Sequence, residues 1–251
     1  MITIKTAEEI QAMRETGQIL GQILQEMSTL AEPGMSTGHL DAFAERRCRE
    51  LNVTPAFKGY RNFPKSVCIS VNNESIHGIP SDTKILKEGD LLKLDFGVIK
   101  NGWYGDSAVT IGVGEISLEN KQLLLVTKEC LIRGINKCKI GMTLGDIGNA
   151  VQGWAESFGF GVVTTYCGHG IGKSLHEAPN VLNYGKRNTG LVLEEGMVLA
   201  IEPMINIGSP EVTVAEDGWT VITKDGSNSA HFEHTVAITK NGPEILTAYK
   251  E

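Results

Sequence analysis

An internal repeat at a constant offset of 107 residues constrains the fold of this 251-residue chain more than any other sequence feature. Residues 86–95 (LKEGDLLKLD) match residues 193–202 (LEEGMVLAIE), and both segments end in an acid. Residues 34–38 (GMSTG) match residues 141–145 (GMTLG) at the same offset, which argues against chance similarity. We therefore expect two similar α/β halves related by a pseudo-twofold axis. No linker-like stretch separates these halves, which cover about 1–115 and 116–251, so one compact domain over 1–251 is expected.

A second constraint is a predicted hairpin over residues 91–111, in which an acid interrupts each apolar strand. Its turn signal is Asn101-Gly102. A two-residue loop places Gly97 opposite Asp106 with Asp95 as the diagonal neighbour, whereas a four-residue loop places Asp95 directly opposite Asp106. In either register both carboxylates point to one face of the sheet. Such a pair requires either a raised pKa or a cation between the two acids.

Apolar periodicity and turn signals predict the remaining elements. Capping boxes at Thr6-x-x-Glu9 and Thr143-x-x-Asp146 mark two helix starts. The expected helices run from 7 to 29, from 36 or 37 to about 51, from 118 to about 138 and from 143 to about 158. The expected strands cover 65–71, 160–166, 198–207 and 232–239, and the expected loops cover 56–64, 72–81 and the glycine-rich segment 167–172. The aromatic loop 56–64 is expected to display rings beside a site.

Composition narrows the class of function. The formal net charge of −7 argues against binding to nucleic acid or anionic membranes through bulk electrostatics, and favours small neutral or cationic partners. The N-terminal segment lacks the pattern of a signal peptide, and no apolar run has the length of a membrane span, so a cytoplasmic protein is expected. The five cysteines are odd in number and show no CxxC spacing, which predicts reduced thiols and no zinc–thiolate site.

Four acids lie within predicted strands, and one histidine lies in the glycine-rich loop at the end of another strand. The set is Asp95, Asp106, Glu202, Glu233 and His169. Four carboxylates on one inner face could not all ionise without cations, but two divalent ions would balance their charge. An oxygen-rich set with one imidazole fits a dinuclear site that activates water for hydrolysis. We therefore expect two divalent metal ions drawn from Co, Mn, Fe and Zn, because the histidine makes Mg alone a poorer fit.

The sequence resembles the methionine aminopeptidases of the short bacterial type I, and the match covers essentially the whole chain. The motifs that carry the resemblance are HGIP at 77–80, LDFG at 94–97, GD at 105–106, GHGIG at 168–172, HE at 176–177, IEP at 201–203 and FEH at 232–234. The resemblance implies the α+β pita-bread fold, in which two pseudo-twofold-related α/β halves surround a central curved antiparallel sheet.

The resemblance also implies a role for each candidate ligand. Asp106 and Glu233 would bridge the two metal ions, and Asp95 would chelate one of them. His169 and Glu202 would complete the coordination of the other ion. Glu202 would in addition take the proton from the bridging water.

Substrate contacts are implied as well. His77 and His176 would contact the scissile amide and its tetrahedral intermediate. The pocket for the methionine side chain would be lined by Tyr60, Phe63, Cys68, Leu175 and Trp219. The implied activity is removal of the N-terminal methionine from peptides and nascent proteins, with a preference for a small second residue, by attack of a metal-activated water on the first peptide bond.

Two rival interpretations remain. A proline-directed peptidase of the same fold would share the metal ligands, but such enzymes usually carry an additional N-terminal domain, for which a first helix starting near Ala7 leaves no room. A metal-free binding protein built on this fold would have lost ligands, whereas this sequence keeps all five. We therefore expect a monomeric hydrolase with no nucleic-acid or membrane partner, and with transient ribosome association left open.

Overall fold

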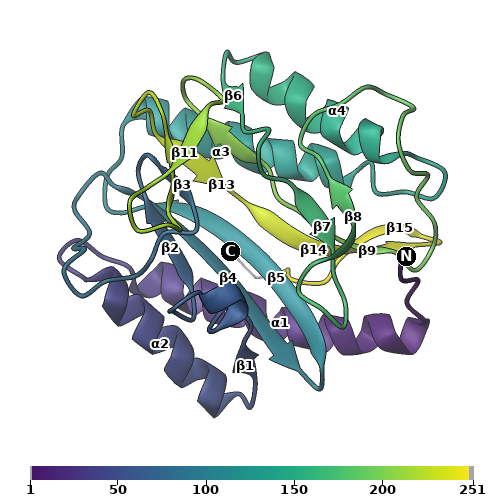
Figure 1. Ribbon diagram of the computed structural model, residues 1–251, viewed down its shortest axis with the longest axis horizontal. Coiled ribbons are helices and arrows are strands. Elements are labelled where there is room, and N and C mark those ends of the chain that lie inside the picture. Colours follow the sequence, from purple (N-terminus) through teal and green to yellow (C-terminus); the bar gives the residue numbers. More distant parts are fainter. Residues whose placement is uncertain (1, 249–251) are drawn as a thin grey trace.

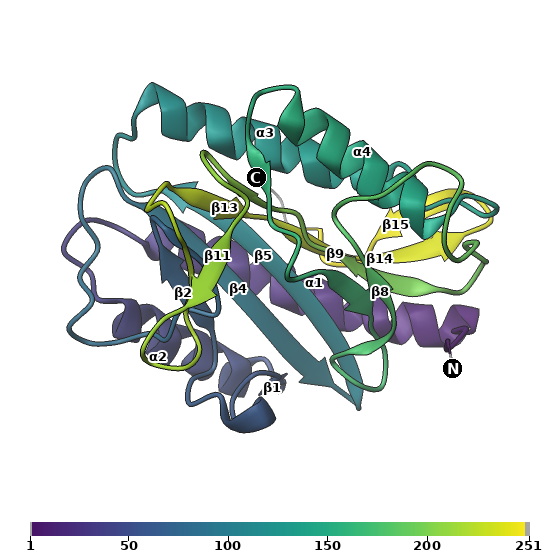
Figure 2. The ribbon, with the colours of Figure 1, turned by 45° about the horizontal axis from the view of Figure 1, so that its top comes forward.

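A computed structural model describes residues 2–248, which form a strongly curved antiparallel sheet with long helices packed along it (Figure 1). Helices α1 (Ala7–Leu30) and α2 (Thr37–Glu50) lie along the lower side of the strands in Figure 1. Helices α3 (Leu118–Ile135) and α4 (Leu144–Glu156) lie along the upper side, and Figure 2 shows the same arrangement from a second direction. The predicted α+β class is confirmed.

The helices begin where the sequence predicts. Thr6 caps α1 and Thr143 caps α4, each through a reciprocal capping box with the acid three residues later. The side chain of Ser36 accepts the first-turn hydrogen bond of α2, and Ser117 does the same for α3. No helix within residues 2–248 is both long enough and apolar enough to cross a membrane.

The strands form one large sheet and two small ones. The large sheet has the order β1-β4-β5-β14-β9-β7-β8, with β2 added on β4 and β15 on β14. The small sheets are β13-β10-β6 and β11-β12-β3. The bounds are β1 Thr54–Pro55, β2 Cys68–Val71, β3 Glu74–Ile76, β4 Leu91–Lys100, β5 Trp103–Gly112, β6 Gly161–Val162, β7 Gly168–Gly170, β8 Glu177–Val181, β9 Val198–Ile201, β10 Met204–Asn206, β11 Val212–Val214, β12 Val221–Thr223, β13 Ser229–His231, β14 Glu233–Thr239 and β15 Gly242–Ile245.

The internal repeat is visible as equivalent backbone pairing at the predicted offset. An isolated bridge joins Ser36 to Ile85 in the first half, and the equivalent bridge joins Thr143 to Val192 in the second. The hydrogen bond from the N–H of residue 34 to the carbonyl of residue 86 likewise recurs between residues 141 and 193. The two repeated segments therefore build the same junction, which leads into β4 with Asp95 in one case and into β9, followed directly by Glu202, in the other.

The central hairpin adopts the tighter of the two predicted registers. Lys100 pairs with Trp103, so the loop contains only Asn101 and Gly102, and Gly97 lies opposite Asp106. Asn101 and Gly102 have φ values of 51° and 76°, the left-handed pair that a tight hairpin turn requires.

The two faces of β4 serve different purposes. Leu92, Leu94 and Phe96 are fully buried and belong to the same core cluster as Leu20 and Leu24 of α1. Because side chains alternate along a strand, the odd-numbered residues of β4 point to the opposite face, away from that helix. This face, inside the curve of the sheet, is where the acids gather.

Several predicted element boundaries are wrong. The strand expected over 65–71 begins only at Cys68, and that expected over 160–166 pairs only at Gly161–Val162, because its partner β10 is short. The loop expected over 72–81 contains β3, which pairs with the distant β12. The strand expected over 198–207 is interrupted at Glu202-Pro203, since proline cannot donate a ladder hydrogen bond.

Candidate metal centre and substrate pocket

Five neighbouring strands of the large sheet each bring one candidate ligand to the inner face. In the spatial order β4, β5, β14, β9 and β7, the side chains are Asp95, Asp106, Glu233, Glu202 and His169. Asp95 and Asp106 lie in the middle of their strands, and Glu233 opens its strand. Glu202 follows the last residue of β9. The strands therefore gather residues that are up to 138 positions apart in the sequence.

Strand register explains why three of these carboxylates converge. Asp95 and Glu233 both lie opposite Ala108 of β5, one on each side of it. Asp106 lies two residues before Ala108 on β5, so its side chain points to the same face. Directly opposite residues in antiparallel strands also share a face. The three acids are thus fixed around one point of the sheet.

The same logic places the other two candidates. Ala200 of β9 lies opposite His169 on one side and opposite Thr235 on the other. Glu202 follows Ala200 by two residues, and Glu233 precedes Thr235 by two. Both therefore point to the face that carries His169. Sheet geometry alone brings all five candidate side chains together.

Interatomic distances describe a tight cluster. The His169 Nε2 atom is 3.8 Å from Asp106 Oδ2 and 3.6 Å from Glu202 Oε1. One ligand atom from each of Asp106, His169 and Glu233 lies within 4.8 Å of the others. Asp95, Asp106, Glu233 and His169 are all buried.

This environment is unfavourable to ionised carboxylates on their own. Burial raises the pKa of Asp95 to about 7 and the pKa of Glu202 to about 8. Burial, and then repulsion from the neighbouring acids, raises the pKa values of Asp106 and Glu233 well above their ordinary range. The pKa of His169 is lowered to about 3, chiefly by burial, so its imidazole is neutral.

The unpaired atoms of the cluster fit a divalent cation. Asp106 Oδ1 and Glu233 Oε1 are buried and have no hydrogen-bond partner within residues 2–248, although such atoms normally have one. His169 donates its Nδ1–H to the carbonyl oxygen of Gly170 at 2.9 Å, which leaves the Nε2 lone pair directed at the acids. Carboxylate oxygens with one imidazole form a donor set suited to Mn, Fe, Co or Zn.

His169 lies on strand β7, and its predicted place in a loop is wrong. The flanking glycines let β7 fit closely between β8 and β9. A Cβ on Gly168 would lie 2.3 Å from the carbonyl oxygen of Ala200, and one on Gly170 would lie 2.3 Å from that of Ala178. The glycines thus allow close packing of the strands. In the sequence alone, glycines with this role look the same as glycines in a flexible loop.

The two accessory histidines lie beside the acidic cluster. The centroids of the His176 and His169 rings are 4.1 Å apart. The His176 ring also stacks on Tyr60, whose hydroxyl oxygen lies 2.8 Å from His176 Nδ1. His77 has a left-handed backbone with φ of 59°, a conformation uncommon outside glycine and often found at functional sites. Burial lowers the pKa values of both histidines to about 4, so both are neutral.

A cavity of about 130 Å³ opens over the cluster. All of the sequence-predicted site residues line it: Tyr60, Phe63, Cys68, His77, Asp95, Asp106, His169, Leu175, His176, Glu202, Trp219 and Glu233. Phe63, Cys68 and Leu175 are buried, and Trp219 is half-buried. The cavity therefore has an acidic base and a largely apolar wall.

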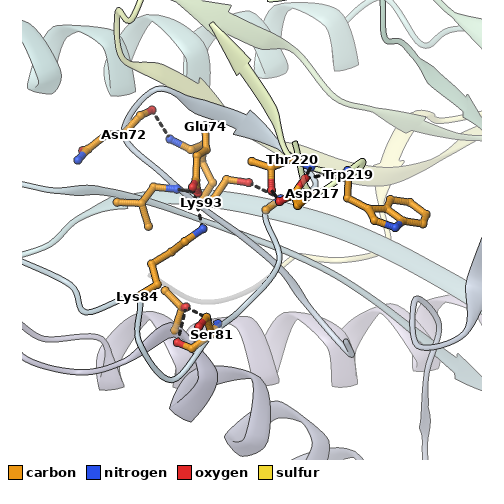
Figure 3. A network of polar contacts seen from close by, with 12 residues as sticks. Asn72, Glu74, Ser81, Lys84, Lys93, Asp217, Trp219 and Thr220 are labelled. Carbon is orange, nitrogen blue, oxygen red and sulfur yellow. Dashed lines mark hydrogen bonds and ion pairs between the residues drawn. The ribbon is translucent and has the colours of Figure 1, made fainter. Parts of the chain in front are cut away.

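Trp219 is held at the wall by a tight turn (Figure 3). Asp217 Oδ1 accepts hydrogen bonds from the backbone N–H groups of Trp219 and Thr220, at 2.9 and 2.8 Å. The Trp219 ring packs edge-on against the Phe63 ring, with 5.1 Å between the ring centroids. The centroid of the His77 ring lies 6.4 Å from that of Trp219. Trp219 therefore lines the same cavity as the acidic cluster.

Figure 3 also draws Lys93, a buried lysine of β4. The Lys93 ammonium donates to the carbonyl oxygens of Asn72 and Ser229 at 2.8 and 2.9 Å. Burial lowers its pKa to about 7. Lys93 therefore ties the turn before β3 to β13.

Three residues near the site are absent from the predicted set. Phe57 and Arg61 also line the cavity. Both belong to the aromatic loop 56–64, which the sequence marks as lying beside a site without identifying which side chains face it. His231 is buried, and its Nε2 lies 3.6 Å from Glu202 Oε2. The sequence feature that could have indicated His231 is its position two residues before Glu233, because side chains two residues apart in an extended chain point to the same side.

Known proteins resemble this chain over its full length. The model of metallopeptidase family M24 matches residues 11–240. A methionine aminopeptidase of Clostridium acetobutylicum is 51% identical over 247 residues, which covers 98% of this chain and 99% of that protein. The methionine aminopeptidase of Escherichia coli K12 is 45% identical over 251 residues, which covers 100% of this chain and 95% of the relative.

Solved structures show the same similarity in space. A methionine aminopeptidase from Thermotoga maritima superposes with a TM-score of 0.97 at 46% identity, covering 98% of this chain and 99% of that one. A prolidase from Pyrococcus furiosus superposes with a TM-score of 0.81 at 26% identity. The match covers 99% of this chain but only 66% of the prolidase, so the prolidase contains a large additional segment.

Proposed function

Because the chain belongs to metallopeptidase family M24, we propose that it removes the N-terminal methionine from peptides and newly made proteins. The observation that carries this proposal is the set of four carboxylates and one imidazole on neighbouring strands, at the base of a small apolar cavity. The similarity to methionine aminopeptidases over the full chain supports the same reaction.

The residues proposed to hold divalent metal are Asp95, Asp106, His169, Glu202 and Glu233. The two unpaired buried oxygens and the number of carboxylates support two ions drawn from Co, Mn, Fe and Zn. When bound, such ions supply Lewis-acid polarisation of the scissile carbonyl and lower the pKa of water.

Glu202 is proposed to accept the proton of the attacking water and to return it to the leaving amine. Its position supports this role, since it lies between two histidines at the edge of the cluster and lines the cavity. Removal and return of the proton by one positioned carboxylate is general base followed by general acid catalysis.

His176 and His77 are proposed to hold the scissile amide. With Tyr60 donating its O–H to Nδ1, the neutral His176 carries its proton on Nε2. That N–H can donate to the carbonyl oxygen, where negative charge develops in the tetrahedral intermediate. His77 is fixed by its neighbour, because a Cβ on Gly78 would lie 2.3 Å from the Ile69 carbonyl oxygen and only glycine fits there.

The cavity wall supports methionine as the first residue. An unbranched thioether fills irregular apolar space and makes favourable contacts with ring edges. Phe63 and Trp219 present such edges, and Cys68 and Leu175 complete a narrow wall. The free α-amine would lie at the acidic base of the cavity. A long second side chain would clash near His77, so small second residues are preferred.

The proposed substrates are the N-terminal segments of newly made proteins, and the cytoplasm is the proposed site of the reaction. All proposed site residues come from one chain, which supports action as a monomer.

A peptide panel tests the proposed activity. We expect release of free methionine from Met-Ala-Ser, slow release of leucine from Leu-Ala-Ser, and none from Lys-Ala-Ser, because the wall is apolar and pockets of this kind discriminate by roughly 1 to 3 kcal/mol per methylene. Formyl-Met-Ala-Ser should not be cleaved, because its blocked amine cannot bind at the acidic base. Products are measured by mass spectrometry.

Two outcomes of the panel would contradict the proposal. Equal rates on formylated and free peptides would remove the α-amine from recognition. Hydrolysis of an Ala-Pro dipeptide control in preference to Met-Ala-Ser would favour the activity named for the prolidase neighbour.

A further inference from the structure

The cavity carries its acids at the base and one guanidinium at its mouth. Among the described residues that line it, Arg61 is the only lysine or arginine. Arg61 is exposed, whereas the cluster at the base is buried. A peptide whose N-terminus reaches the base must therefore leave the cavity past a fixed positive charge.

Contacts place Arg61 beside Tyr60 and, through Tyr60, near His176. Its guanidinium carbon lies 5.4 Å from the centre of the Tyr60 ring, and Tyr60 in turn stacks on His176. An extended peptide advances roughly 3.3 to 3.6 Å per residue, so a third residue lies about 7 Å beyond the first.

The backbone holds Arg61 in this place. Gly59, Arg61 and Asn62 all have positive φ, at 84°, 48° and 70°. The turn is closed by hydrogen bonds from the N–H of Gly59 to the Phe63 carbonyl and from the N–H of Phe63 to the Tyr60 carbonyl, both 2.9 Å. Left-handed arginine is uncommon, and such conformations cluster at binding sites.

Arg61 is also available for a ligand. Within residues 2–248 no carboxylate forms an ion pair with Arg61, whereas Arg14 and Arg47 pair with Glu244 and Glu26. Its planar fork of N–H donors matches the geometry of a carboxylate.

We propose that Arg61 recognises a carboxylate on the peptide downstream of the scissile bond, so that N-termini with an acidic third residue are preferred substrates. This inference rests on the proposed aminopeptidase function. It assigns Arg61 to substrate specificity beyond the first two residues. A free C-terminal carboxylate on a very short peptide offers the same chemistry, and the experiment separates the two sources.

The test compares kcat and KM on amidated peptides Met-Ala-X-Ser with X as Glu, Gln or Lys. For the unaltered protein we expect kcat/KM to fall in that order, with about a two- to fivefold advantage of Glu over Gln at low salt, as for an exposed ion pair. The advantage should lie in KM, because Arg61 contacts a part of the substrate that does not react. It should shrink at high ionic strength.

Two variants and one control isolate the guanidinium. Arg61→Gln should remove the dependence on X, and Arg61→Lys should retain part of it. Arg187→Gln makes the same change in net charge at an exposed residue outside the cavity, and should keep the full dependence. The inference would be overturned if Arg61→Gln kept the ranking Glu over Gln over Lys. It would also be overturned if the unaltered protein did not show this ranking.

A second pair of substrates distinguishes the sources of the carboxylate. Met-Ala-Gln is compared as the free acid and as the amide. A preference for the acid that requires Arg61, together with no dependence on X, would overturn third-residue selection and assign Arg61 to the ends of short peptides. Absence of methionine release from every peptide would overturn the proposed function, and this inference with it.

Discussion

Glu233→Gln should lose methionine release by more than about 100-fold, even with divalent metal in excess. Loss of a residue that only supports metal ligands typically costs 10- to 100-fold. Glu233 stands at the centre of the candidate ligands, with Oε1 buried and without a hydrogen-bond partner in residues 2–248. Replacing its carboxylate by a neutral amide removes one charge and one metal-binding oxygen while preserving side-chain shape. Initial rates and bound metal per chain are measured together.

The same variant should fold at least as well as the unaltered protein when both are free of metal. Burial and the neighbouring acids disfavour the ionised form of Glu233, and glutamine is neutral without taking up a proton, so the variant removes that cost of folding. Glu32→Gln, at an exposed acid outside the cluster, is the matched control and should leave the rate and the stability unchanged. Full activity of Glu233→Gln in the presence of metal would rule out Glu233 as a required ligand.

Stability of the metal-free protein should decrease as the pH rises from about 6.5 to 8. The folded-state pKa values of Asp95 and Glu202, about 7 and about 8, lie above their ordinary values, and those of Asp106 and Glu233 lie higher still. In this window the folded state binds more protons than the unfolded state, so the free energy of unfolding falls with increasing pH. Each raised group contributes up to about 1.4 kcal/mol per pH unit.

Other buried groups act with the opposite sign but do not reverse this trend. The buried histidines have lowered pKa values, so their contribution to the free energy of unfolding is present above their unfolded pKa near 6.5 and is lost as the pH falls below it. That pKa lies at the lower edge of the window. Lys93, with its pKa lowered to about 7, stabilises the folded state as the pH rises, but it is one group against four. Urea unfolding of the metal-free protein at pH 6.5 and pH 8 measures the difference.

Added divalent metal should abolish this dependence, since a cation favours the ionised form of every carboxylate that contacts it. Glu233→Gln should show a shallower pH dependence than the unaltered protein. Greater stability of the metal-free protein at pH 8 than at pH 6.5 would contradict the repulsive cluster.

The acids of the site were readable from the sequence because each stands inside an apolar strand pattern, where a charge needs an explanation. The repeat placed Asp95 and Glu202 at equivalent positions, and the turn at Asn101-Gly102 limited the hairpin to two registers. The choice between these registers depends on the left-handed turn itself. Local patterns thus defined the strands that carry the acids and the face to which they point.

Features that depend on distant pairing could not be read in the same way. The glycines around His169 look like a loop locally, and become a strand only because β8 and β9 pack against both edges. Pairing with β12 likewise creates β3 within an apparent loop. Arg61 lines the cavity from an irregular left-handed turn that has no periodicity.

The central claim is that the carboxylate cluster binds divalent metal and that bound metal enables methionine release. It is tested most directly by titrating metal-free protein with Mn²⁺ or Co²⁺ while measuring bound metal and free methionine from Met-Ala-Ser in the same samples. We predict that the rate is at background without metal and rises with metal occupancy until the site is filled. A metal-free protein that releases methionine at the full rate, or a filled site that releases none, would contradict the account.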